Sequence, residues 1–121
     1  MKIIKTFVSL IIISQITACS SATGIFSSDA IPKWLEYAKE GQEHLVDNEY
    51  KKASKLFNKA LKIDLKNADL QTLNAIAYHL QSRNDNTANL TLAEEGYKLS
   101  SKFDPANWIP HYLMGQIYLE E

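Results

Sequence analysis

The sequence predicts an all-α fold, and three observations carry that prediction. Apolar residues recur at steps of three and four along most of the chain after residue 29, which is the period of an amphipathic helix. No useful length of chain alternates apolar and polar residues as a half-buried strand would. The 121 residues include only four Gly and three Pro, which suits helices better than a turn-rich β-sandwich. We therefore expect antiparallel helix pairs joined by short turns.

Two helices are expected before residue 64. Pro32 suits the first turn of the first helix, and Ser28 or Asp29 can cap it. Asp47-Asn48 should end this helix, because both residue types favour turns. The second helix is expected over Tyr50–Ile63, where apolar residues again fall on one face.

Three further helices are expected after a turn at Asp64–Asn67. The third carries its apolar residues from Leu70 to Leu80 and runs into a polar loop, Ser82–Asn86. Thr87 should cap the fourth helix. Asp104-Pro105 combines a cap with a first-turn proline, so we expect it to open a fifth helix over Ala106–Glu120.

The first 18 residues have the plan of an export signal. Lys2 and Lys5 precede an almost wholly apolar run at residues 7–13, and small residues follow it. The alternative is a retained membrane helix. The strongly apolar run is far shorter than the roughly 20 residues that such a helix needs, which favours export.

The end of this segment, Ile16-Thr17-Ala18-Cys19, resembles the lipobox of bacterial lipoproteins. The resemblance implies cleavage before Cys19, a diacylglycerol thioether on its sulfur and acylation of the new N-terminus. Ser20-Ser21, with no Asp after the cysteine, implies the outer membrane of a Gram-negative host, facing the periplasm. The alternative is an idle thiol. We divide the chain into a signal peptide (1–18), a flexible tether bearing Cys19 (19–29) and a helical domain (30–121).

A repeat runs through the helical domain. Its residues in the first unit are Gly41, Ala53, Phe57, Ala60 and Asp64. Counterparts recur 34 or 40 residues on at Ala75, Ala93, Tyr97, Ser100 and Asp104, and again at Trp108, Gly115 and Tyr118. This pattern resembles the tetratricopeptide repeat. The resemblance implies a short α-solenoid of about two helix pairs and a final helix. An unrelated helical bundle is the alternative.

The composition argues against several functions. Thirteen Lys and Arg against 14 Asp and Glu give a net charge of −1, without the basic excess of a nucleic-acid-binding protein. One Cys and three widely spaced His offer no metal-ligand cluster. There is no phosphate-binding loop or catalytic triad pattern, so we expect no enzyme activity, cofactor, metal or small-molecule substrate.

Two surfaces are expected to bind partners. The repeat resemblance implies a concave groove that holds a protein or peptide, lined by Gln42, Leu45, Asp69, Thr72, Ile76, His79, Tyr112, Gln116 and Leu119. The last helix is apolar almost all round, so Met114, Ile117 and Tyr118 are expected to be partly bare. That patch would serve self-association or a partner, with a tolerated apolar cap as the alternative.

Together these expectations describe a lipid-anchored periplasmic scaffold that recruits an envelope protein. Resemblance to repeat lipoproteins suggests help in assembling an outer-membrane secretin of a pilus or secretion system. The alternative is an accessory subunit that regulates a cell-envelope enzyme, such as a peptidoglycan hydrolase.

Overall fold

The computed structural model describes residues 30–84 and 87–120. The helices are α2 (Lys33–Val46), α3 (Tyr50–Ile63), α4 (Ala68–Ser82), α5 (Thr87–Phe103) and α6 (Ile109–Glu120). The described part of the chain contains no strand, so the all-α prediction is confirmed. The expected signal peptide, the expected tether with Cys19, and the expected caps Ser28 and Asp29 lie outside the described residues.

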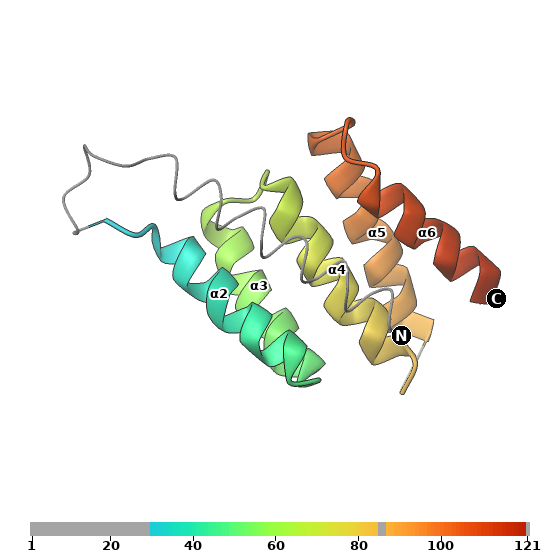
Figure 1. The fold of residues 1–121 in the computed structure, drawn as a ribbon, viewed down its shortest axis with the longest axis horizontal. Helices are drawn as coiled ribbons and strands as arrows, with labels where there is room; N and C mark the ends of the chain where they lie inside the picture. Colours follow the sequence, from blue (N-terminus) through green and yellow to red (C-terminus); the bar gives the residue numbers. More distant parts are fainter. Residues whose placement is uncertain (1–29, 85–86, 121) are drawn as a thin grey trace.

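The helices pack in chain order, each antiparallel to the one before, as Figure 1 shows from α2 at one end to α6 at the other. α4 therefore lies in the middle, between α3 and α5. This position explains why ten of the eleven residues from Leu70 to Leu80 are buried, all except Tyr78. The core is a single cluster that takes residues from all five helices.

The α2–α3 pair closes around a glycine and an aromatic ring. A Cβ on Gly41 would lie 2.7 Å from Cε1 of Phe57, so only glycine lets the ring lie against α2. Ala53 and Phe57, two of the repeat residues, are both completely buried. The expected break is present, and Asn48 adopts φ 65°, a left-handed conformation that asparagine tolerates.

The α4–α5 pair uses the same packing with the glycine moved to the other helix. Ala75 stands where α2 has Gly41, and it brings a Cβ into the contact. Gly96 on α5 makes room, because a Cβ there would lie 2.8 Å from the Cβ of Ala75. The repeat comparison did not find Gly96, since it lies one residue before the aromatic position at Tyr97.

The helix starts differ in part from the expected ones. The prediction that α6 begins at Ala106 is wrong, because the Asp104 oxygens accept hydrogen bonds from the backbone N–H groups of Ala106 and Asn107 in a turn. Asn107 then accepts from the N–H of Ile109 at 3.0 Å and starts the helix. Pro32 is the residue before α2, not in its first turn. Asn67 caps α4 by accepting from the N–H of Leu70 at 3.1 Å.

Candidate functional site

Five of the nine residues expected to line a concave groove are buried, so the predicted groove is wrong for them. They are Gln42, Leu45, Thr72, Ile76 and His79. On α4 this face meets α5: the Thr72 hydroxyl lies 2.6 Å from Ser100 Oγ, and His79 Nδ1 lies 3.3 Å from Tyr97 Oη. Positions repeated every 34 residues thus face the second helix of their own pair, which covers them.

The other four expected groove residues are accessible, but they do not lie on one helix. Asp69 is half-buried in the first turn of α4. Burial, together with the carboxylate of Asp104, raises the pKa of Asp69. Tyr112 and Gln116 are half-buried on α6, and Leu119 is 82% exposed. Three of these four therefore belong to α6.

The expected bare patch on α6 is correct only in part. Ile117 is 1% exposed, because it lies on the face of α6 that packs into the core, with Pro110 and Leu113. Met114 is half-buried against the core. Tyr118 is exposed, and its hydroxyl donates to Oε1 of Glu94 on α5 at 2.8 Å.

α6 repeats the residues of α2 but not their burial. Trp34, Gly41, Gln42 and Leu45 recur 74 residues on as Trp108, Gly115, Gln116 and Leu119. Leu45 is 3% exposed and Leu119 is 82% exposed. A Cβ on Gly115 would meet no atom within 4 Å, whereas one on Gly41 would strike Phe57. We call Trp108, Tyr112, Gly115, Gln116 and Leu119 the open face of α6.

On its opposite side, α6 packs against α5 in the way that α4 packs against α3. Tyr78 on α4 accepts a hydrogen bond from Asn58 on α3 at 2.9 Å. Tyr118, 40 residues on, reaches back in the same way to Glu94 on α5. Each of these helices therefore docks on the pair before it, and α4 alone of the two is also covered by the helix that follows.

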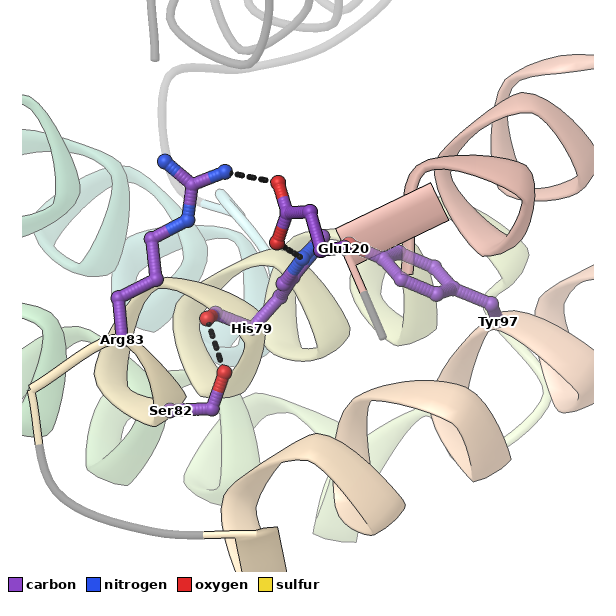
Figure 2. A network of polar contacts seen from close by, with 5 residues as sticks. All are labelled: His79, Ser82, Arg83, Tyr97 and Glu120. Atoms are coloured by element: carbon purple, nitrogen blue, oxygen red, sulfur yellow. Dashed lines mark hydrogen bonds and ion pairs between the residues drawn. The ribbon is translucent and has the colours of Figure 1, made fainter. Parts of the chain in front are cut away.

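A buried polar junction holds the end of α6 in place (Figure 2). His79 is completely buried, with Nε2 3.5 Å from Oε2 of Glu120, and Arg83 forms an ion pair with the same carboxylate. Burial lowers the pKa of His79; the Glu120 carboxylate opposes this shift and Arg83 adds to it. Burial also raises the pKa of Tyr97. The junction thus joins α4, α5 and α6.

Among residues 30–84 and 87–120, no group of three His, Cys, Asp or Glu could hold a metal ion. Within the same ranges, no helix is both long and apolar enough to cross a bilayer. The open face of α6 is the candidate site, and a comparison of the first helix with the fifth would have found it in the sequence.

Comparison of the chain with protein-family models, with curated proteins and with solved structures found no match in any of the three.

Proposed function

We propose that this chain is a protein-binding adaptor of the tetratricopeptide type, with no chemistry of its own. The observation that carries the proposal is the contrast between Leu45 and Leu119. They hold the same position in equivalent helices, yet the first is buried in the core and the second is exposed. An exposed apolar position on a helix built like its covered counterpart is a surface suited to a protein partner.

The proposal includes attachment to a membrane. The lipobox-like sequence ending at Cys19 supports a lipid anchor, and the small polar residues that follow support a tether between lipid and helices. Several acyl chains would give stable anchoring, at about 0.8 kcal/mol for each buried CH₂. In this proposal the anchor fixes the adaptor at the periplasmic side of the outer membrane, and the helices recruit a partner there.

The specific form of the proposal is assembly of an outer-membrane secretin. It rests on the combination of lipobox and repeats, and it names a partner that can be sought directly. The competing role, regulation of a peptidoglycan hydrolase, predicts a different partner.

Photo-crosslinking in native envelopes tests the proposal. A photoreactive amino acid at Met114 or Tyr112 would be activated in cells, and the attached proteins identified by mass spectrometry. We expect one envelope protein at both positions, a secretin in the specific form, and its loss when Ala53→Trp disrupts the fold. If no protein attaches at these or at other exposed positions, the adaptor function is excluded.

A further inference from the structure

The two helices that cover their neighbours share one arrangement of side chains. α3 places Phe57 between Ala53 and Ala60, and α5 places Tyr97 between Ala93 and Ser100. In both helices the order is a small residue, an aromatic residue four positions on, and a small residue three positions after that. All six side chains are completely buried. The aromatic ring fills the space between the helices, and the small residues let the backbones approach.

The positions opposite these side chains are those repeated in the open face. Phe57 lies against Gly41, and Gly115 occupies the same position in α6 with open space around it. Ser100 meets Thr72, whose counterpart in α6 is Tyr112, and Tyr97 meets His79, whose counterpart is Leu119. The open face therefore resembles the surface of α2 or α4 that packs against the next helix, with space at Gly115 for an aromatic ring.

We propose that the open face of α6 binds an amphipathic helix of a partner protein that presents an aromatic side chain over Gly115. Small residues four positions before and three positions after the aromatic residue complete the contact. This inference rests on the proposed adaptor function and names the chemistry of its partner. The five positions of the open face carry no charged side chain, so the matching face of the partner helix is uncharged as well.

A second copy of the chain does not supply such a helix. Within residues 30–84 and 87–120, the small–aromatic–small order occurs only around Phe57 and Tyr97. Both of these side chains are completely buried in their own domain, so a second copy could offer them only by opening its core. A second copy is therefore not the occupant, and we assign the open face to a helix of a different protein.

A peptide that copies α3 serves as the probe. It has the sequence of residues 50–63, with its helix fixed by a lactam between Lys51 and a Glu in place of Lys55, two positions that are exposed on α3. The protein is the full mature chain from residue 19 with Cys19→Ala, which avoids detergent. Fluorescence anisotropy should give saturable binding, weakened at least tenfold when the peptide carries Phe57→Ala.

Gly115→Phe is the decisive variant. Because nothing lies within 4 Å of a Cβ at this position, the fold should tolerate the ring, which then fills that space. We expect it to weaken peptide binding at least tenfold, with an unchanged thermal melting curve. The matched control Leu92→Phe, at an exposed position of α5, should leave binding unchanged. Binding that survives Gly115→Phe would mean that the peptide displaces α3 or attaches elsewhere, and would overturn the inference.

Two further outcomes are informative. A dimer in light scattering that Gly115→Phe dissociates would make a second copy the occupant and overturn the inference. In cells, a crosslinker at Leu119, the most exposed position of the open face, should capture the partner, and one at Val46, an exposed position of α2, should not. Capture at Val46 alone would remove this inference and keep the adaptor function, whereas capture at neither would remove both.

Discussion

The ring of Phe57 lies so close to Gly41 that a Cβ atom, which every other residue carries, would have no room there. The nearest ring carbon is 2.7 Å from that Cβ position, and Phe57 has no exposed surface through which to move aside. Gly115, at the same place in α6, faces open space. A glycine at this repeat position is therefore required by the packing in α2, whereas in α6 it leaves space for another side chain.

The two glycines should respond to alanine in opposite directions. Gly41→Ala forces a methyl group into a filled core, which costs about 1–3 kcal/mol, only partly offset by the roughly 1 kcal/mol by which alanine favours a helix. Gly115→Ala receives only the helix-propensity gain, so we expect the protein to be up to about 1 kcal/mol more stable. Urea unfolding of both variants measures this difference. Equal effects at the two positions would contradict the packing described at Gly41.

Ala53→Trp should unfold the domain. Ala53 is completely buried where α3 meets α2, so an indole there exceeds the overpacking of about 1–3 kcal/mol that cores usually absorb. Circular dichroism should show loss of the cooperative thermal transition. Lys55→Trp, two residues along and exposed, is the matched control and should melt as the wild type does. An unchanged melting curve for Ala53→Trp would refute the helix register.

The fold could be predicted because spacing along a helix determines which residues share a face. Ala53, Phe57 and Ala60 fall on one face, and all three are buried as expected. The start of α6 was missed because Asp104 uses its oxygens in a turn, which leaves Asn107 as the cap. Spacing alone could not show which of these two side chains, three residues apart, would accept the hydrogen bond next to the helix start.

The site was predicted less well, for a related reason. Spacing shows that Leu45, His79 and Leu119 hold equivalent positions, but their exposure depends on whether another helix lies over them. Leu45 is buried in the core and His79 contacts Tyr97 on α5, so these two residues cannot line a groove. Gly96 was missed because the glycine of this contact lies on the second helix of the pair, opposite Ala75, whereas in α2–α3 it lies on the first. A comparison of equivalent positions cannot detect a glycine that moves from one helix to the other.

Cys19→Ala should abolish attachment of lipid to the protein. The substitution removes the thiol that would form the thioether, so neither lipid attachment nor cleavage before residue 19 can follow. Palmitate labelling should disappear, and the protein should leave the membrane fraction or remain as the uncleaved precursor. Cleavage before residue 19 in wild-type protein, shown by intact mass, is the companion measurement. A Cys19→Ala protein that still incorporates palmitate would contradict the lipobox prediction.

Stability should fall as the pH drops below about 6.5, because of His79. Burial holds the pKa of His79 below its usual value of 6.5 in the folded protein, so the unfolded chain binds a proton first as the pH falls. The contribution is fully present above pH 6.5 and is lost as the pH falls toward the folded pKa. One proton limits the slope to about 1.4 kcal/mol per pH unit. Urea unfolding at pH 7.5, 6.5 and 5.5 measures it.

Two variants assign that slope to the junction in Figure 2. His79→Gln should lower stability at every pH, since Tyr97 loses its contact with the imidazole and Glu120 keeps only Arg83, but it should flatten the pH dependence between 7.5 and 5.5. Glu120→Gln should steepen it, because the carboxylate opposes the effect of burial on the pKa of His79. The ion pair with Arg83 is partly exposed, so Arg83→Ala should cost less than about 1 kcal/mol. A slope that survives His79→Gln would place the titrating group elsewhere.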